Sequence, residues 1–263
     1  MKKSQMTIDR LRDYTINPLI TKFGKIVEKK HFTEIPIIIG ASPRSGTTLL
    51  LAILDAYPHI HSIQRQTYAF AKWTEKEPSI PPRIDRLYRE LLLHKISPQS
   101  TRWCEKTPRN IRYFGNILHF FQGKVKLIHL IRDGRDVVTS KHPLHKPDEY
   151  WVTVKRWIND VKAGLQYQDH PQVFTLKYED LIFNFDREVK KLSKFLEEEF
   201  IPTTNSWKEK TSLKKSKHWG QPIQDLHARS IERWKKAEHK KRMQEFWQIP
   251  GAGDLLYELG YEV

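Results

Sequence analysis

A cluster of residue types suited to binding an anion lies at residues 40–48, Gly-Ala-Ser-Pro-Arg-Ser-Gly-Thr-Thr. Arg44 supplies a fixed positive charge, and Gly46 allows the backbone to approach a ligand closely. Thr47 and Thr48 add hydroxyl donors. When such a turn joins a strand to a helix, free backbone N–H groups and the helix dipole point at the ligand. The segment therefore predicts an anion-binding loop.

This loop differs from the ATP-type phosphate loop, G-x-x-x-x-G-K-[ST]. Five residues separate Gly40 from Gly46, where that motif has four, and Thr47 stands in place of its lysine. The cation lies two residues before the glycine, at Arg44. No predicted strand ends in a clear metal-binding aspartate. We therefore expect a poor site for Mg-ATP and a suitable site for an anion bound without a metal.

The elements that must position this loop alternate between strands and helices. Residues 35–40 are apolar and rich in β-branched side chains, which is typical of a strand buried on both faces of a parallel sheet. Further strands are predicted at 59–63, 101–105, 125–131 and 173–178. Helices are predicted at 47–57, 83–95, 109–121, 135–141, 149–168, 185–198, 226–247 and 252–259. The alternation predicts an α/β fold, a three-layer α/β/α domain with a roughly five-stranded parallel sheet like that of P-loop NTPases.

Two segments resemble motifs of the sulfotransferase superfamily, whose sulfuryl donor is 3′-phosphoadenosine-5′-phosphosulfate (PAPS). Pro-Arg-Ser-Gly-Thr-Thr at 43–48 is similar to the loop that holds the 5′-phosphosulfate. Residues 127–140 resemble the 3′-phosphate motif, with Arg132 at a strand end and Ser140 eight residues later. An arginine at the carboxyl end of such a strand faces the ligand crevice, and its planar fork suits phosphate oxygens.

Three further segments carry the resemblance. Tyr-Glu-Asp-Leu at 178–181 is similar to a strand end whose tyrosine lies near the adenosine, and residues 103–108 are similar to the W-x-[DE]-K-T-P of many bacterial members. The tail at 231–261 resembles their C-terminal region. The resemblance implies a sulfotransferase domain at 35–263, preceded by a basic, partly helical extension at 1–34. It implies no metal ligand, and these PAPS-binding residues: Pro43, Arg44, Ser45, Gly46, Thr47, Thr48, Arg132, Ser140 and Tyr178.

The implied reaction moves a sulfuryl group from PAPS to a hydroxyl group and leaves adenosine 3′,5′-bisphosphate. Negative charge builds on the leaving phosphate, so the site needs cations there and a way to remove the acceptor proton. Arg44 is the first predicted catalytic cation. Lys106 is implied as the second, near the bridging or sulfuryl oxygens. As in phosphoryl transfer, positioning and electrostatics do most of the catalysis, here without a required metal.

The general base is less evident. Many relatives carry a glutamate after the second strand, where this chain has Gln-Arg-Gln at 64–66, and cytosolic small-molecule enzymes use a histidine where it has Pro108. Neither glutamine nor charged arginine removes a proton at neutral pH. Three explanations stay open: His59, His61 or Glu105 serves as the base, the acceptor is already acidic, or the enzyme is weak or redirected.

The acceptor is expected to be a carbohydrate or a small molecule with a hydroxyl group, acidic or glycan in character. In related folds the segment after the second strand contributes to the acceptor pocket, and here it carries Tyr68, Phe70 and Trp73 together with Arg65 and Lys72. The aromatic rings suit stacking on a sugar, and the cations suit an anionic acceptor. The alternative is that these aromatic side chains pack in the core.

The formal net charge of +15 raises the local concentration of anions. It fits a small anionic ligand, an acidic polysaccharide, nucleic acid or an anionic membrane, and with the resemblance no nucleic-acid partner is expected. Asn17 and Pro18 predict the start of a basic amphipathic helix at 17–30. Such a helix can lie on a membrane surface, but packing on its own domain is commoner, and we expect the latter.

The chain has no apolar run near the roughly 20 residues of a membrane span, no recognisable secretory signal, and one cysteine, Cys104. We therefore expect a cytoplasmic protein. Besides the sulfotransferase, two functions stay open. One is an ATP phosphotransferase of the kinase type on the same architecture, and the other is a non-catalytic protein that binds polyanions.

Overall fold

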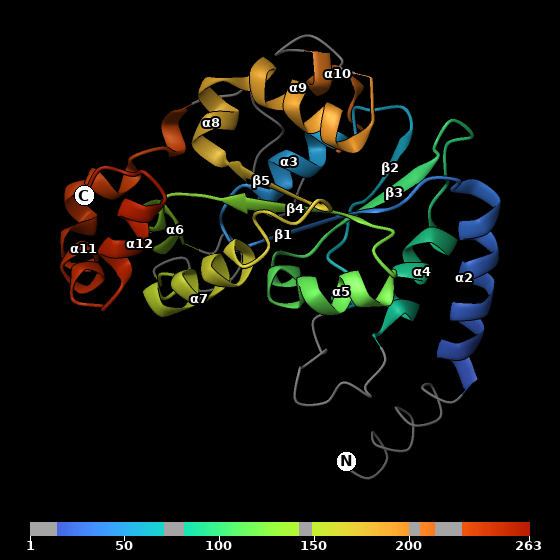
Figure 1. The fold of residues 1–263 in the computed structure, drawn as a ribbon, viewed down its shortest axis with the longest axis horizontal. Coiled ribbons are helices and arrows are strands. Elements are labelled where there is room, and N and C mark those ends of the chain that lie inside the picture. The colour runs from blue at the N-terminus through green and yellow to red at the C-terminus, as the bar shows by residue number, and fades with distance from the viewer. Residues whose placement is uncertain (1–14, 71–81, 142–148, 200–205, 214–227) are drawn as a thin grey trace.

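The computed structural model describes residues 15–70, 82–141, 149–199, 206–213 and 228–263 (Figure 1). In this part of the chain five strands form one sheet of order β2-β3-β1-β4-β5, in which all neighbours are parallel. The strands are β1 (Ile37–Ala41), β2 (Ile60–Ile63), β3 (Arg102–Lys106), β4 (Lys126–Ile131) and β5 (Val173–Lys177). Each lies within two residues of its predicted range, and the predicted parallel sheet is confirmed.

Strand β1 lies at the centre of the sheet and is buried on both faces. Ile37 and Ile39 pack into the core on one face, and Ile38 packs into the core on the other. Because successive side chains of a strand point to opposite faces, a central strand must be apolar at every position. This explains the unbroken apolar run in the sequence, which places the anion-binding loop at the carboxyl end of the central strand.

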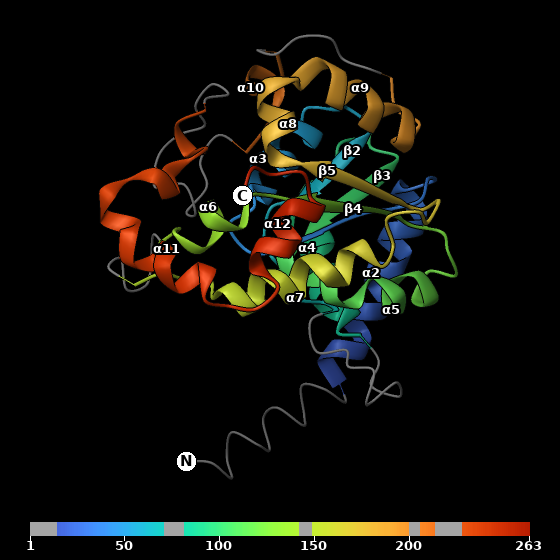
Figure 2. The same cartoon turned by 60° about the vertical axis from the view of Figure 1, so that its left-hand side comes forward.

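Helices cover both faces of the sheet, as predicted for a three-layer fold (Figures 1 and 2). One layer contains α3 (Thr47–Leu54), α8 (Tyr178–Phe183), α9 (Phe185–Leu196) and α10 (Ser206–Lys210). The other contains α2 (Asn17–His31), α4 (Ile84–Leu93), the 3₁₀ helix η2 (Pro108–Tyr113), α5 (Phe114–Phe120) and α7 (Val154–Leu165). A third apolar cluster joins α7 to α6 (Gly134–Val138), α11 (Lys240–Trp247) and α12 (Ala252–Glu258) near the carboxyl ends of the strands.

Several predicted helices differ from the structure, and the one expected at 149–168 covers only Val154–Leu165. The helix expected at 109–121 is divided into η2 and α5. The helix expected at 226–247 is continuous only as α11, since residues 228–239 form three short 3₁₀ turns, at Ala228–Ser230, Arg233–Lys235 and Ala237–His239. Helix α2 begins at Asn17 itself, so Pro18 takes its second position, where its missing N–H costs no intrahelical bond.

Helix α2 packs on the domain, as expected, with Gly24 against the ring of Tyr88 in α4. A Cβ atom at Gly24 would lie 2.2 Å from the Cβ of Tyr88, so only glycine permits this approach. Glu28 accepts hydrogen bonds from Tyr88 Oη (2.7 Å) and from Trp103 Nε1 in β3 (2.8 Å). Among the described residues, no helix has the length and apolar character needed to cross a membrane.

Candidate active site

The anion-binding loop connects β1 to α3. Arg44 (φ 73°) and Gly46 (φ 95°) both adopt left-handed backbone conformations. A Cβ atom at Gly46 would lie 2.4 Å from a ring carbon of Tyr178, so the close contact requires glycine. No side chain caps α3, and its first turn contains no acidic residue. The turn therefore presents free N–H groups and a positive dipole end, as an anion site requires.

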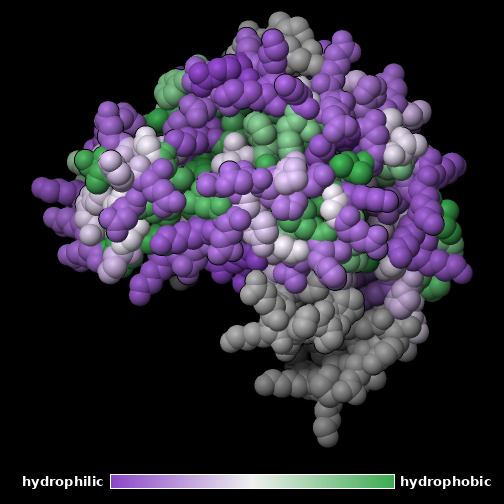
Figure 3. Space-filling model, in the orientation of Figure 1, coloured by the Kyte–Doolittle hydropathy of each residue, from purple (hydrophilic) through white to green (hydrophobic). Residues whose placement is uncertain are grey.

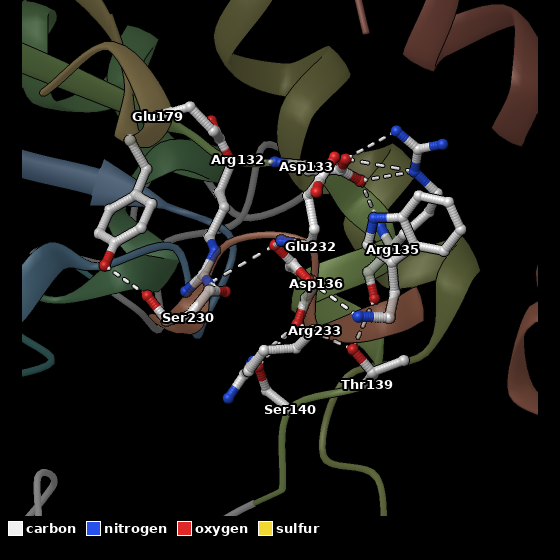
Figure 4. A network of polar contacts seen from close by, with 12 residues as sticks. Arg132, Asp133, Arg135, Asp136, Thr139, Ser140, Glu179, Ser230, Glu232 and Arg233 are labelled. Carbon is white, nitrogen blue, oxygen red and sulfur yellow. Dashed lines mark hydrogen bonds and ion pairs between the residues drawn. The ribbon is translucent and has the colours of Figure 1, made fainter. Parts of the chain in front are cut away.

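Arg132 lies just beyond β4 and contacts this loop. Its Nη1 donates to the carbonyl oxygen of Arg44 at 3.1 Å, and its guanidinium stacks over the Tyr178 ring, 4.4 Å from the centroid. Its Nη2 donates to the carbonyl oxygen of Ser230. Tyr178 Oη shares a 2.8 Å hydrogen bond with Ser230 Oγ. Tyr178 thus fills the space between Gly46 and Arg132, and Figure 4 shows Ser230 beside the guanidinium.

Ser140 follows α6 and contacts an arginine from the C-terminal segment. Arg233 Nη2 donates to Ser140 Oγ (2.5 Å), and that hydroxyl donates to the carbonyl oxygen of Asp136 (2.8 Å). The Asp136 carboxylate accepts from the backbone N–H groups of Glu232 (2.9 Å) and Trp234 (3.2 Å). Asp136 therefore fixes the turn that carries Arg233 (Figure 4).

Asp133 and Glu179 brace the start of α6. The Asp133 side chain caps the helix by accepting from Arg135 N (2.8 Å) and pairs with the Arg135 guanidinium (2.8 Å). Glu179 accepts from Asp133 N (3.1 Å) and from Tyr261 Oη (2.8 Å). These contacts fix the backbone between Arg132 and Ser140, so both side chains keep a defined position at the strand end.

The charges of the three arginines are balanced only in part, by the carboxylate of Asp136. Burial, followed by the charges of Arg233 and Arg132, lowers the pKa of Arg44 to about 10. Burial and Arg132 also lower the pKa of Arg233. Asp136 lies 3.8 Å from Arg132, and its own pKa is raised by burial. The Nε atoms of all three arginines are buried without a hydrogen-bond partner among the described residues. Buried donors without partners are costly, so the cluster fits a ligand with several negative charges.

Lys106 ends β3 beneath the start of α3. Its side chain is 2% exposed, and its Nζ donates to Thr48 Oγ1 at 3.3 Å. Burial lowers the pKa of Lys106 to about 8, although Glu105 opposes the shift. A buried ammonium group beside the anion-binding loop is the kind of perturbed group that accompanies functional sites.

None of the three base candidates is placed to take a proton beside Lys106. The Glu105 carboxylate accepts hydrogen bonds from Thr67 N and Oγ1, Thr107 Oγ1 and Asn110 Nδ2, at 2.6–3.2 Å. His59 precedes β2, at the opposite end of the sheet from the loop, and pairs with Glu198 at 3.3 Å. His61 opens onto a cavity of about 430 Å³ beside β2, together with Glu90 and His94. Glu105 is therefore a structural anchor, because its acceptor sites are already used.

The acceptor segment after β2 is only partly described. Phe70 is fully buried and packs against Phe120 and Phe121, so it belongs to the core. Tyr68 is exposed, has a left-handed backbone (φ 52°), and donates from its N–H to Thr107 Oγ1 at 3.3 Å. Gln64, Arg65 and Gln66 carry no carboxylate into the site. Lys72 and Trp73 lie outside the described residues.

The structure brings most of the predicted site residues together. Arg44, Gly46, Arg132, Ser140 and Tyr178 belong to one connected network, and Thr48 with Lys106 adjoins it. The remaining loop residues form the turn itself: Pro43 is half-buried, whereas Ser45 and Thr47 are buried.

Three residues of this network were not predicted from the sequence: Asp136, Ser230 and Arg233. The signal for Arg233 is its place in Ile-Glu-Arg-Trp at 231–234, which belongs to the tail that resembles the C-terminal region of the family. Asp136 lies inside the predicted 3′-phosphate motif, but no local pattern connects it with its partners 96 and 98 positions away.

Comparison with known proteins agrees with this geometry. A model of the "Sulfotransferase family" matches residues 36–202, more than half of the chain. Sulfotransferase 1B1 of the dog, Canis lupus familiaris, is 26% identical over 200 residues, which cover 68% of this chain and 66% of the relative. The chain thus spans just under two thirds of that relative's length.

Two solved structures share the fold. The sulfotransferase domain of the Synechococcus PCC 7002 olefin synthase has a TM-score of 0.59 at 16% identity, covering 89% of this chain and 96% of that domain. The mouse sulfotransferase SULT7A1 complexed with PAP has a TM-score of 0.51 at 14% identity, covering 86% and 88%.

Proposed function

The chain belongs to the sulfotransferase family, and we propose that it transfers the sulfuryl group of PAPS to a hydroxyl group of an acceptor. The observation that carries the proposal is the cluster of Arg44, Arg132 and Arg233, whose buried Nε donors have no partner among the described residues. PAPS carries negative charge at both its 3′-phosphate and its 5′-phosphosulfate. It therefore matches a site whose cations lie on three linked segments, the loop after β1, the end of β4 and the turn at Arg233.

The loop and α3 would hold the 5′-phosphosulfate. The free N–H groups at the start of α3 and the hydroxyl groups of Thr47 and Thr48 donate to its oxygens, and Arg44 adds a charge. Because Gly46 has no Cβ atom, the ring of Tyr178 can pack directly against the backbone of the loop. The 5′ end is thus bound largely by the main chain.

Arg132, Ser140 and Arg233 would hold the 3′-phosphate. Ser140 Oγ already accepts from Arg233 and donates to the backbone, so both side chains are positioned before a ligand arrives. The pKa of Arg233 is lowered by burial and by Arg132, and an anion would relieve that repulsion. Tyr178 lies between the two ends and supplies an aromatic surface beside the nucleoside.

PAPS supplies the sulfuryl group and a phosphate leaving group. Arg44 and Lys106 stabilise the charge that develops as that group leaves, in a site where burial makes such interactions strong. Lys106 must be protonated for this role, and its buried position beside Thr48 orients the ammonium group toward the loop. An acceptor hydroxyl group then has to lose its proton, and Glu105 is not available for that step because its oxygens accept four hydrogen bonds.

The acceptor is a hydroxyl compound of the carbohydrate or small-molecule class. The exposed ring of Tyr68 and the exposed guanidinium of Arg65 follow β2, next to the strand that ends in Lys106. An aromatic face and a cation there favour an anionic sugar or ring over an uncharged aliphatic alcohol.

Thermal unfolding with nucleotides tests the proposal. Adenosine 3′,5′-bisphosphate without Mg²⁺ should raise the Tm of the wild type, whereas Mg-ATP should not. Transfer of labelled sulfate from PAPS to a panel of phenols, sugars and acidic glycans should then identify an acceptor. Stabilisation by Mg-ATP alone would favour a kinase. Binding of heparin with no transfer to any acceptor would favour a polyanion-binding protein.

A further inference from the structure

Helix α2 presents a second apolar face that its packing on the domain does not use. Its inner face contacts α4 and β3 through Gly24 and Glu28, and Ile20 and Val27 pack against the core. On the outer side, Leu19, Phe23 and Ile26 are each 54% exposed. The helix is therefore held in place by one face while large apolar side chains point outward from another.

The exposed side chains form a continuous stripe. Ile16, Leu19, Phe23 and Ile26 are spaced by three or four residues, so on a helix they lie one above another. Single exposed apolar residues are common, but a stripe of four on one helix marks an interaction surface. Figure 3 shows hydrophobic residues over α2 at the right-hand edge, among strongly hydrophilic ones.

Positive charge runs beside the stripe. At roughly 100° per residue, Lys22, Lys25 and Lys29 lie together on the flank next to it, and all three are exposed. Glu28 is the single acidic residue between Asn17 and His31, and its carboxylate is used by Tyr88 and Trp103. The outer side of α2 is thus apolar and cationic without any acidic residue.

We propose that the outer face of α2 binds the surface of an anionic lipid bilayer. The stripe enters the boundary between headgroups and acyl chains, and the lysines contact anionic headgroups, as in helices that lie in the plane of a membrane. Charge complementarity selects this occupant, because a second copy of the same face would bring like charges together. The chain's net charge of +15 adds to the attraction.

The position of α2 is compatible with activity at the membrane. Figures 1 and 2 show α2 along an edge of the domain, whereas α6, which follows Arg132, lies toward the other end of the sheet. Binding through α2 therefore leaves the arginine cluster open to its ligand.

Co-sedimentation of the full chain with vesicles tests this proposal. The wild type should bind vesicles of equimolar phosphatidylcholine and phosphatidylglycerol, bind vesicles of phosphatidylcholine alone far less, and be released by salt. Phe23→Ser should lower the bound fraction several-fold. The double variant Lys22→Glu, Lys25→Glu should lower the partition coefficient by about tenfold or more, since each lysine near an anionic surface contributes appreciably.

Matched controls separate this surface from general charge and hydrophobicity. Phe183→Ser removes another exposed phenylalanine, 64% exposed on α8, and Lys190→Glu with Lys194→Glu makes the same charge change on α9. These controls should bind like the wild type, and every variant should keep its Tm. No binding by the wild type, or equal losses from the α2 and α9 variants, would overturn the proposal. So would a wild-type dimer that Phe23→Ser dissociates, because the face would then be a contact between copies.

Discussion

The guanidinium of Arg132 donates a hydrogen bond to the carbonyl oxygen of Arg44 at 3.1 Å, although the two residues are 88 positions apart. The contact joins the end of β4 to the loop after β1, which are neighbouring strands of the sheet. It also brings the charge of Arg132 close enough to Arg44 to lower the pKa of Arg44. A change at either residue should therefore affect ligand binding at both ends of the site.

Arg132→Lys should weaken the binding of adenosine 3′,5′-bisphosphate by about tenfold to a hundredfold, because lysine keeps the charge but loses the planar fork. Isothermal titration calorimetry measures this directly. Arg187→Ala, a change at an exposed arginine on α9, serves as the control and should bind normally. An unchanged affinity in Arg132→Lys would remove Arg132 from the proposed 3′-phosphate site.

Asp136→Asn should weaken the same ligand without contacting it, since Asp136 anchors Glu232 and Trp234 and so positions Arg233. We expect a loss smaller than that of Arg233→Ala, and little further loss when the two changes are combined, because they act through one guanidinium. Calorimetry on the two single variants and the double variant gives a double-mutant cycle for the binding free energy. Additive losses would mean that Asp136 acts independently of Arg233.

Lys106→Met should stabilise the free protein while removing sulfate transfer. Burial lowers the pKa of Lys106 from 10.5 to about 8, which corresponds to an unfavourable contribution on the order of 3 kcal/mol at neutral pH. Replacing such a charge with an apolar chain of similar shape should raise the Tm by roughly 5 °C or more. Calorimetric scans and labelled-sulfate assays measure the two effects. Transfer at the wild-type rate would exclude Lys106 from the chemistry.

The stabilisation by Lys106→Met should depend on pH. Below pH 8 Lys106 is charged in both the folded and the unfolded chain, so the penalty is fully present. Between about pH 8 and 10.5 Lys106 binds a proton in the unfolded chain but not in the folded chain. The free energy of unfolding of the wild type therefore increases as the pH rises through this range. The difference in Tm between variant and wild type should therefore shrink over this range. A constant difference would contradict the lowered pKa.

The same ionisation should appear in the kinetics. For the free enzyme, kcat/KM for PAPS should fall above about pH 8 as Lys106 loses its proton. The bound anion favours the ammonium form, so kcat should persist to higher pH than kcat/KM. Rates measured between pH 6 and 10 at low and at saturating PAPS separate the pH dependence of kcat/KM from that of kcat.

Glu105→Gln should lower stability without removing an essential base from the acidic side of the pH profile. Its carboxylate accepts from Thr67, Thr107 and Asn110, and an amide nitrogen placed there would face donors. We expect a fall in Tm of about 5 °C or more, with the acidic side of the pH–rate curve unchanged. The fall in rate at alkaline pH should move to lower pH, because the charge of Glu105 raises the pKa of Lys106. A stable variant without transfer activity would instead restore Glu105 as a base.

The strands could be predicted from sequence because their signal is local. Residues 37–41 are buried on both faces of the sheet, so every position must be apolar. Such a run can be recognised without knowledge of the rest of the chain. The helix predicted at 226–247 was wrong over residues 228–239 for the opposite reason. That backbone is held by distant partners, with Ser230 bound to Arg132 and Glu232, in a left-handed conformation, bound to Asp136. Local propensity contains no information about such contacts.

The same distinction applies to the site. Arg44 and Arg132 could be predicted because each follows a recognisable strand within a segment that resembles a motif of the family. Arg233 follows no strand, and it reaches the site only because Asp136 fixes the turn around it. Glu105 was one of the predicted base candidates, but adjacent residues of a strand point to opposite faces, and its side chain contacts Thr67 and Asn110 instead.

The unbalanced arginines also bear on how long the protein survives in a cell. Arg44, Arg132 and Arg233 repel one another until an anion lies among them, so ligand binding adds directly to the free energy that keeps the chain folded. A chain without its ligand opens more often and is degraded faster by proteases. The steady-state amount of the protein should therefore follow the supply of the nucleotide it binds, even when synthesis is constant.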